Sequence, residues 1–248
     1  MLLSELPSDM FKGLKQLEKL DLEKNKITVL RRNTFSAVPE LKTLILCHNK
    51  ISEIEPGTFT GLSLYKLDLK FNKLGNLSDG LFRHLRALEV LDLAKNGLVT
   101  VPYNTFDGCG GLRSLNLARN RIQHIDPGAF ARLKLERLDL SRNELTVLER
   151  DAFNDLQIDN LLDLRFNNIS KIKLRACKNL KAWQISLCHN NMTKVGRNRG
   201  RRNKSLKKII IKCSKLQNKH ARFDGICSMS KNQTNSPTLN SGNERKDG

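Results

Sequence analysis

The chain is 248 residues long, 39% of its residues are hydrophobic, and its formal net charge is +19. This positive charge makes anionic molecules a class of partner to consider. No apolar run approaches the roughly 18 to 20 residues of a membrane-spanning helix. We therefore expect no transmembrane segment within this chain.

One pattern recurs along most of the chain. It reads LxxLxLxxNxLxxL with a Phe ten residues after the Asn, and its first complete copy runs from Leu17 to Leu30 and closes at Phe35. A fixed period of about 24 residues is typical of a leucine-rich-repeat solenoid. The asparagines recur with nearly this spacing, at Asn25, Asn49, Asn72, Asn96, Asn120, Asn143, Asn167 and Asn190.

Before this first copy, the apolar residues Leu3, Leu6, Phe11 and Leu14 fit the second half of a repeat. The first residues lack the basic start and the long apolar core of a signal peptide. We therefore expect an array that begins in mid-repeat without a cap, as in a fragment or after an alternative start. Such an end exposes Leu3, Leu6 and Leu14, which predicts low solubility or a homodimer through this end.

Each repeat is predicted to contain a short strand, a turn at the Asn and an irregular or short-helical return. Leu20 and Leu22 lie two residues apart and point to one side of the strand, whereas Asp21 points to the other. Stacked repeats bury their leucines in a continuous core. The predicted fold class is an α/β solenoid, a leucine-rich-repeat horseshoe with a parallel concave sheet of about nine strands spaced by about 4.8 Å.

Two columns are expected to hold the repeats together. An inward Asn amide both donates and accepts hydrogen bonds, so the recurring asparagines are predicted to satisfy the backbone groups of the turns as a structural ladder. The recurring Phe is predicted to fill the space behind the sheet. This second column comprises Phe35, Phe59, Phe82, Phe106, Phe130 and Phe153.

The pattern weakens after Phe153. Asp159 and Ala182 replace the first Leu of their repeats, and Cys177 replaces the Phe. The LxxLxL spacing returns once more over 206–211, which indicates one last strand.

The chain is therefore divided into three parts. A repeat array over 1–195 holds a partial first repeat and eight complete repeats of nearly constant length. A basic, degenerate C-terminal repeat or cap follows over 196–227. The polar tail over 228–248 is predicted to be disordered.

This consensus resembles the typical 24-residue leucine-rich repeat of extracellular proteins, such as Toll-like receptor ectodomains, Slit-like proteins and the acid-labile subunit. The resemblance covers residues 3–195. It implies a horseshoe solenoid that binds proteins or other macromolecules, with no catalysis and no cofactor of its own. Members usually carry cysteine caps. The N-terminal cap is missing here, and Cys213 and Cys227 are expected to form a reduced C-terminal cap closed by a disulfide.

The concave face is the default binding site, because a solenoid presents it as one broad surface. Four residues before each Asn stands a mainly acidic column, which is either a stripe for a basic ligand or the ordinary residue of this position. One residue before each Asn the column is cationic and aromatic, a mixture suited to binding and equally consistent with solvated surface.

We expect a protein ligand on this face. The expected aromatic anchors are Tyr65, Phe71, Phe166 and Trp183. The predicted ligand-binding residues are Lys19, Asp21, Tyr65, Asp68, Lys70, Phe71, Asp92, Asn116, Arg137, Asp139, Asp163, Arg165 and Trp183.

A basic segment runs from Lys194 to Arg222, with twelve Lys or Arg and no Asp or Glu. Such a cluster attracts polyanions through a salt-sensitive electrostatic term, and outside the cell a glycosaminoglycan is the expected partner. A furin-type cleavage site at 199–202, a nuclear localisation signal and a solubilising loop stay open as alternatives. The predicted polyanion-binding residues are Arg197, Arg199, Arg201, Arg202, Lys204, Lys207 and Lys208.

The remaining polar motifs concern modification and thiols. Cys109 takes an inward Leu position and is predicted to be a buried free thiol. Cys47 and Cys188 lie six repeats apart, roughly 29 Å at strand spacing, which excludes a disulfide between them. Adjacent Cys-His residues point to opposite faces of a strand, so no metal site is predicted. The predicted glycosylation sites are Asn76, Asn168, Asn191, Asn203 and Asn232.

No catalytic constellation is found. The five His are dispersed, and no Gly-rich phosphate loop follows a strand. The sequence therefore predicts a non-enzymatic, extracellular recognition module, secreted or at the cell surface, that binds protein through its concave face. One alternative is a matrix-type protein that binds glycosaminoglycan through the basic segment. A second alternative is an intracellular or nuclear leucine-rich-repeat scaffold.

Overall fold

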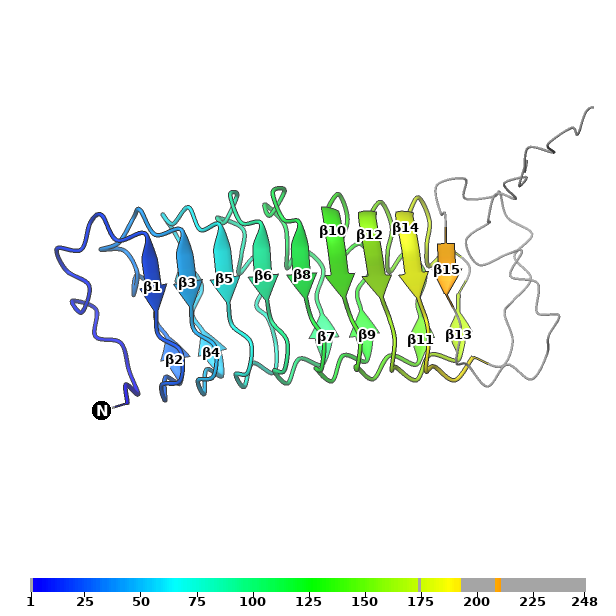
Figure 1. Cartoon of the computed structure of the whole chain (residues 1–248), viewed down its shortest axis with the longest axis horizontal. Helices are drawn as coiled ribbons and strands as arrows, with labels where there is room; N and C mark the ends of the chain where they lie inside the picture. Colours follow the sequence, from blue (N-terminus) through cyan, green and yellow to red (C-terminus); the bar gives the residue numbers. More distant parts are fainter. Residues whose placement is uncertain (1, 174, 193–207, 211–248) are drawn as a thin grey trace, which may run out of the picture.

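The computed structural model describes residues 2–173, 175–192 and 208–210. Nine strands form one parallel sheet in the order β1-β3-β5-β6-β8-β10-β12-β14-β15, and Figure 1 shows them side by side along the longest axis. This arrangement confirms the predicted solenoid with a parallel sheet. The strands are β1 (Lys19–Asp21), β3 (Thr43–Ile45), β5 (Lys66–Asp68), β6 (Val90–Asp92), β8 (Ser114–Asn116), β10 (Lys134–Asp139), β12 (Gln157–Asp163), β14 (Lys181–Ser186) and β15 (Lys208–Ile210).

The register of this sheet follows directly from the period of the sequence. Leu20 pairs with Leu44, and Leu44 pairs with Leu67. The same repeat position therefore lies at the same height in each turn, and a residue type that recurs in the sequence becomes a straight column in space. Alternate strand residues point inward, so one set of columns builds the core and the other set forms the outer face of the sheet.

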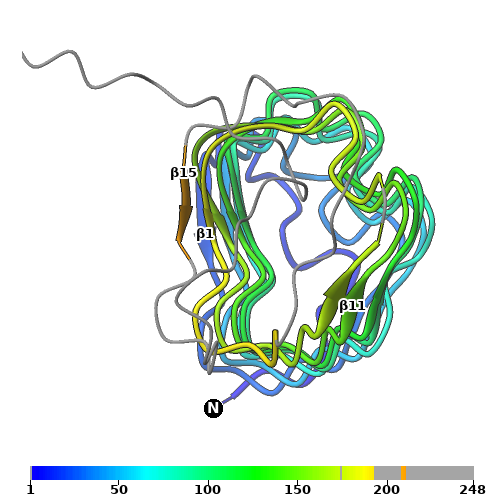
Figure 2. The same ribbon diagram turned by 90° about the vertical axis from the view of Figure 1, so that its right-hand side faces the viewer.

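Three small parallel sheets lie on the opposite side of the solenoid. They pair β2 (Val29–Leu30) with β4 (Glu53–Ile54), β7 (Thr100–Val101) with β9 (His124–Ile125), and β11 (Val147–Leu148) with β13 (Lys171–Ile172). Figure 2, which looks along the solenoid, places β11 across the molecule from β1 and β15.

The returns between the sheets are irregular, and no residue that the structure describes belongs to a helix. In one return, the N–H groups of Thr58 and Leu62 donate to the carbonyls three residues earlier, which marks separate tight turns. Gly57 and Gly61 adopt left-handed φ angles of +88° and +83°. These left-handed residues interrupt the right-handed backbone that a helix requires.

A stack of phenylalanines fills the space behind the large sheet, as the sequence predicts. Neighbouring rings from Phe11 to Phe153 lie 5.8 to 6.5 Å apart between centroids and are nearly parallel. Phe11 belongs to this stack, so the column begins one repeat earlier than the predicted list. Full burial of one such side chain contributes roughly 1.5 to 3 kcal/mol.

The first turn is better covered than the sequence indicates. Leu6 and Phe11 are buried in the core, and Leu3 packs against the core while half-buried. The Leu3 N–H donates to Asn25 Oδ1 over 2.9 Å. The prediction that this end exposes Leu3 and Leu6 is therefore wrong, whereas Leu14 is 47% exposed as expected.

β12 contains a bulge that changes one predicted core position. Ile158 pairs with Leu135 on one side and with Ala182 on the other, and the register shifts directly after it. The bulge at Asp159 and Asn160 leaves Ile158 buried in the leucine position. The prediction that Asp159 occupies this position is wrong, because an extra strand residue costs less than an inward carboxylate without partners.

Candidate ligand-binding surfaces

The ladder asparagines join every described repeat to the one before it. Asn120 is representative: its amide nitrogen donates to the carbonyls of Leu93 and Leu117 over 3.0 Å, and its oxygen accepts from the N–H groups of Asn96 and Leu98. The two carbonyls belong to consecutive repeats. The side chain therefore satisfies groups of two turns at once. The same pattern of bonds recurs at Asn49, Asn72, Asn96, Asn143, Asn167 and Asn190.

The acidic column lies at the last position of each short strand. The strand register aligns Asp21, Ile45, Asp68, Asp92, Asn116, Asp139, Asp163 and Ser186. The side chains of Asp68 and Asp92 accept hydrogen bonds from the N–H two residues later, over 3.1 and 3.0 Å. Asn116 makes the same bond over 3.1 Å. Because an uncharged amide serves equally well, one role of this position is to satisfy the backbone where the strand ends.

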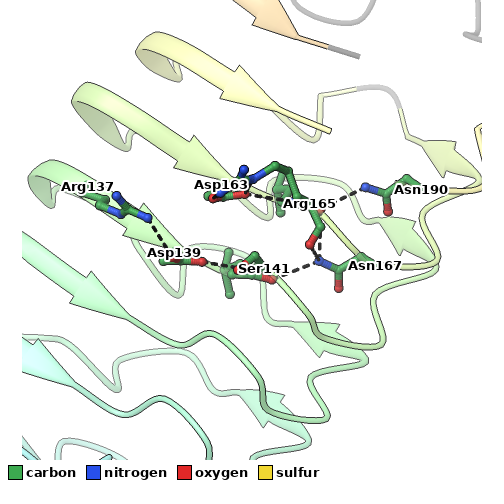
Figure 3. A network of polar contacts seen from close by, with 9 residues as sticks. Arg137, Asp139, Ser141, Asp163, Arg165, Asn167 and Asn190 are labelled. Atoms are coloured by element: carbon green, nitrogen blue, oxygen red, sulfur yellow. Dashed lines mark hydrogen bonds and ion pairs between the residues drawn. The ribbon is translucent and has the colours of Figure 1, made fainter. Parts of the chain in front are cut away.

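Two of these carboxylates hold an arginine on the outer face of the sheet (Figure 3). Asp163 is fully buried, and the guanidinium of Arg165 binds it through two nitrogens, with Nη2 at 2.6 Å from Oδ2 and Nε at 2.9 Å from Oδ1. Arg137 donates to Asp139 over 3.0 Å. The hydrogen bond from Arg165 to Asp163 raises the pKa of Arg165. The side chains of Arg137 and Arg165 stay 49% and 43% exposed, so they are fixed in place and still reachable.

Lys70 and Asp68 form a comparable pair at the end of β5, at 3.2 Å. Asp92 on the neighbouring strand differs, because no lysine or arginine among the described residues forms an ion pair with it. Burial raises the pKa of Asp92 above its usual value, and the charge of Asp68 raises it further.

A second outer row runs along the start of the strands. It carries Tyr65 and Trp183, which are 49% and 51% exposed. Between them, Arg113 pairs with Glu89 at 3.2 Å and with Glu136 at 3.6 Å. Among the predicted ligand-binding residues, Lys70, Phe71 and Arg165 therefore lie beyond the last residue of their strands, whereas the others lie on a strand or directly before one.

Phe71 belongs to a row of residues that directly precede the ladder asparagines. Their φ angles lie between 53° and 58°, the left-handed region. Two stacks form in this row. Phe71 lies between the ring of His48, at 4.0 Å, and the ammonium of Lys95, at 3.9 Å. The row consists of Lys24, His48, Phe71, Lys95, Arg119, Arg142, Phe166 and His189.

Phe166 forms the second stack, between the guanidinium of Arg142 at 4.2 Å and the ring of His189 at 4.2 Å. Beside it lies a hollow of about 470 Å³ at the outer rim of the turns. Its lining residues are Gln123, Asn143, Glu144, Thr146, Phe166, Asn167 and Asn168.

Sequence reasoning missed one row. The residues directly after the ladder asparagines also face outward, and most of them in the first five repeats are basic. The sequence does contain a signal for this row, because each of its residues directly follows one of the regularly spaced asparagines. This row consists of Lys26, Lys50, Lys73, Gly97, Arg121, Glu144, Asn168 and Asn191.

The cysteines of the described part carry free thiols. Cys109 is buried as predicted, and its Sγ lies 3.4 Å from the carbonyl oxygen of Phe82. Burial raises the pKa of Cys109 to about 12 and that of Cys47 to about 11. Both thiols are therefore unreactive near neutral pH.

Several predicted sites lie outside the described residues. The predicted disulfide between Cys213 and Cys227 falls there, as do the sequon asparagines Asn203 and Asn232. For Lys208 only the backbone, in β15, is described. The asparagines of the other three sequons, Asn76, Asn168 and Asn191, are exposed. The predicted polyanion-binding residues outside the described part are Arg197, Arg199, Arg201, Arg202, Lys204 and Lys207.

The chain also matches a known protein family. The family described as leucine rich repeat matches seven overlapping stretches, 2–45, 15–64, 39–98, 63–122, 88–145, 110–169 and 134–185. The chain belongs to the leucine-rich-repeat family. Members of this family are typically non-enzymatic binding modules. The described part of the chain contains no candidate membrane-spanning helix.

Individual leucine-rich-repeat proteins match parts of the chain. Podocan-like protein 1 of Mus musculus is 37% identical over 123 residues, which are 48% of this chain and 21% of that protein. The chain spans only 21% to 36% of the length of the first curated relatives that it matches.

Two solved structures show the same fold. The chain in the TLR13–ssRNA13 complex has a TM-score of 0.66 and 24% identity, over 88% of this chain and 36% of that one. The Toll–Spatzle complex of Drosophila gives a TM-score of 0.59 and 20% identity, over 76% of this chain and 30% of that one.

Proposed function

We propose that this chain is a non-catalytic, extracellular recognition module that binds a protein ligand on the outer face of β10, β12 and β14. The observation that carries the proposal is the pair of arginines, Arg137 and Arg165, that are held by Asp139 and Asp163 while their guanidinium groups remain accessible. Trp183 of β14 is the exposed aromatic residue of the same region.

This arrangement suits protein binding for an energetic reason. An arginine that is already fixed by a carboxylate loses little side-chain entropy when a partner arrives. Arg and Trp are also the residue types that most often contribute strongly to interface affinity. A guanidinium with free N–H groups suits carboxylates and backbone carbonyls of the ligand. The preferred ligand therefore presents acidic or extended backbone groups to this face.

The comparisons support a macromolecular ligand and an extracellular setting. The Toll chain, which shares the fold, was solved with the protein Spatzle. Other relatives carry receptor names, such as Toll-like receptor 3 of Bos taurus and reticulon-4 receptor-like 2 of Rattus norvegicus. The exposed sequon asparagines Asn76 and Asn168 agree with a chain that passes through the secretory pathway.

A binding screen with a matched control tests the proposal. The full chain is immobilised and presented with a panel of secreted proteins and receptor ectodomains, and each hit is measured again with two double variants. The first, Arg137→Gln with Trp183→Ala, alters the proposed face. The second, Lys15→Gln with Tyr103→Ala, removes a cation and an aromatic residue of similar exposure elsewhere.

We expect the first variant to weaken a true ligand by at least about tenfold, since two interface hot spots cost more than about 1 kcal/mol each. The control is expected to bind as the unmodified chain does. Hits that respond equally to both variants, or only to the control, would contradict the proposed face.

A further inference from the structure

The turns beyond the carboxyl ends of the sheet strands carry two adjacent outward rows. One row directly precedes the ladder asparagines and the other directly follows them, and the asparagine between them points inward. We call the two rows together the asparagine edge. Its members are Lys24, Lys26, His48, Lys50, Phe71, Lys73, Lys95, Gly97, Arg119, Arg121, Arg142, Glu144, Phe166, Asn168, His189 and Asn191.

The charge of this edge is almost entirely positive. It contains eight Lys or Arg and a single acid, Glu144. Over the first five repeats, from Lys24 to Arg121, it contains seven Lys or Arg and no acid. Glu144 accepts a hydrogen bond from Gln123 over 2.9 Å, and it marks the point where the cationic part of the edge ends.

Backbone bonds hold these side chains in two straight rows. The His48 N–H donates to the carbonyl of Lys70, and the Phe71 N–H donates to that of Ala94, so the first row advances by one repeat per bond. In the second row, the N–H groups of Lys50 and Lys73 donate to the carbonyls of Ile27 and Ile51 in the preceding repeats. At about 4.8 Å per repeat, the five cationic repeats span about 19 Å.

Almost none of this charge is neutralised by described neighbours. Within the described ranges, only Lys24 of these seven residues pairs with an acid, Glu23, at 3.0 Å. In the described part of the chain, the other six basic residues of the first five repeats form no ion pair. Asp68 and Asp92 instead accept hydrogen bonds from the backbone N–H two positions later, and Asp68 also pairs with Lys70, which is not part of the edge.

The aromatic residues of the edge decide which polyanion fits. Proteins that bind single-stranded nucleic acid offer aromatic faces on which bases stack. Here both faces of Phe71 are covered, by His48 and by Lys95, and both faces of Phe166 are covered, by Arg142 and by His189. The phenylalanines of the edge therefore have no open face for a base, which favours a ligand recognised by its anionic groups.

We infer that the asparagine edge of repeats one to five binds a sulfated glycosaminoglycan lying along the solenoid axis. The site is distinct from the protein-binding face proposed above and from the basic segment around 197–208. Each repeat supplies one or two cations to the chain of sulfates. The binding energy comes largely from the release of counterions, as it does for other linear polyanions.

Heparin binding by the full chain tests this inference with three variants, each of which removes four positive charges. The edge variant is Lys26→Gln, Lys50→Gln, Lys73→Gln and Arg121→Gln, which leaves the left-handed row intact. The off-edge control is Lys12→Gln, Lys15→Gln, Lys134→Gln and Lys171→Gln, all at exposed positions. The tail variant is Arg197→Gln, Arg199→Gln, Arg201→Gln and Arg202→Gln.

Affinity for a size-defined heparin fragment is measured as a function of NaCl concentration. We expect the edge variant to lose at least about tenfold in affinity near 0.15 M salt, and its slope of log K against log salt to fall by about three. The off-edge control is expected to keep the slope of the unmodified chain. Thermal unfolding of all variants verifies that the solenoid is intact.

Three results would overturn the inference. The first result is an equal loss of heparin affinity in the edge variant and in the off-edge control, which would show that only net charge matters. The second result is a loss of heparin binding in the tail variant alone, which would show that the basic segment is the site. The third result is tighter binding of a single-stranded RNA of equal charge than of heparin, together with weaker RNA binding by Phe71→Leu. This result would show that the stacks open to accept bases.

Discussion

At the scale of single residues, the described repeats rely on polar side chains that act on the backbone. Each ladder asparagine offers one oxygen and one NH₂ group to backbone atoms that otherwise have no partner in the turn. Most residues at the end of a strand accept an N–H two positions later. At these positions, the charge of a side chain and its ability to donate or accept hydrogen bonds, rather than its size, decide whether a substitution is tolerated.

Asn120→Ala is expected to lower the free energy of unfolding by about 2 to 4 kcal/mol. The N–H groups of Asn96 and Leu98 lose the oxygen that accepts from them, and the carbonyls of Leu93 and Leu117 each lose one of their two amide donors. Asn120→Asp is expected to be at least as damaging, since a carboxylate repels the same carbonyls although its volume is unchanged. Urea unfolding of the full chain measures both. If Asn120→Asp unfolded at the same urea concentration as the unmodified chain, the donor role of this amide would be refuted.

Asp92→Asn is expected to stabilise the chain at neutral pH. Burial raises the pKa of Asp92 in the folded state, so its contribution to stability is complete below the unfolded pKa of about 3.9 and is lost as the pH rises through the folded pKa. The amide removes this loss and still accepts the Ala94 N–H, as Asn116 does for Ala118.

Thermal unfolding of both chains between pH 3 and pH 7 measures this difference. The advantage of Asp92→Asn is expected to grow with pH and to vanish at the acidic end. Asp139→Asn serves as the comparison, because it removes the partner of Arg137 and is not expected to stabilise the chain. A constant difference between the two chains at all pH values would count against the role of Asp92 ionisation.

At the scale of elements, the returns are built from tight turns and left-handed residues rather than from helices. One return passes so close to its neighbour that only glycine fits. Gly108 has a φ of +86°, and a Cβ atom there would lie 2.2 Å from the carbonyl oxygen of Arg83. The spacing of adjacent returns sets this contact. A Cβ atom could therefore be accommodated only if the two repeats moved apart.

Gly108→Ala is therefore expected to cost about 2 kcal/mol or more, from the left-handed backbone and the steric clash together. Gly110→Ala in the same return is the matched control, because a Cβ atom there would have no atom within 4 Å and its φ is not in the left-handed region. Differential scanning calorimetry compares the two. Equal melting temperatures for both variants would show that the returns can move apart at little cost.

At the scale of the whole molecule, the solenoid has a continuous core and a first turn that is only partly covered. The first turn buries Leu6 and Phe11 but leaves Leu2, Met10 and Leu14 more than a third exposed. β15 is the last strand of the sheet that the structure describes. A cluster of exposed apolar side chains at one end favours association with a second copy through that end.

We therefore expect the chain to form a concentration-dependent homodimer through its first turn. Leu14→Lys with Met10→Lys is expected to shift sedimentation toward the monomer, because the new charges repel each other across the contact. Val99→Lys with Tyr103→Lys, at exposed apolar positions elsewhere, is expected to leave the equilibrium unchanged. A chain that sediments as a monomer at high concentration would exclude this dimer.

The sequence by itself determined the period, the parallel sheet and the columns of Leu, Asn and Phe. These follow from the sequence because stacking at a fixed period places equal positions side by side, whatever the details of each turn. It also located the aspartates and the pre-asparagine residues. The bulge at Asp159 was not predictable from the period. Its free-energy cost depends on how β10 and β14, the strands on both sides of β12, pair with a strand that holds one more residue.

Only the tertiary structure decided which side chains have partners. The bidentate contact between Arg165 and Asp163, the coverage of Phe71 on both faces, and the lack of an ion pair at Asp92 among the described residues depend on side-chain geometry across repeats. A one-dimensional pattern places residues on a common row, but it does not fix the rotamers and burial that determine charge pairing. For this reason the repeat fold could be derived from the sequence, whereas the proposed binding surfaces required the structure.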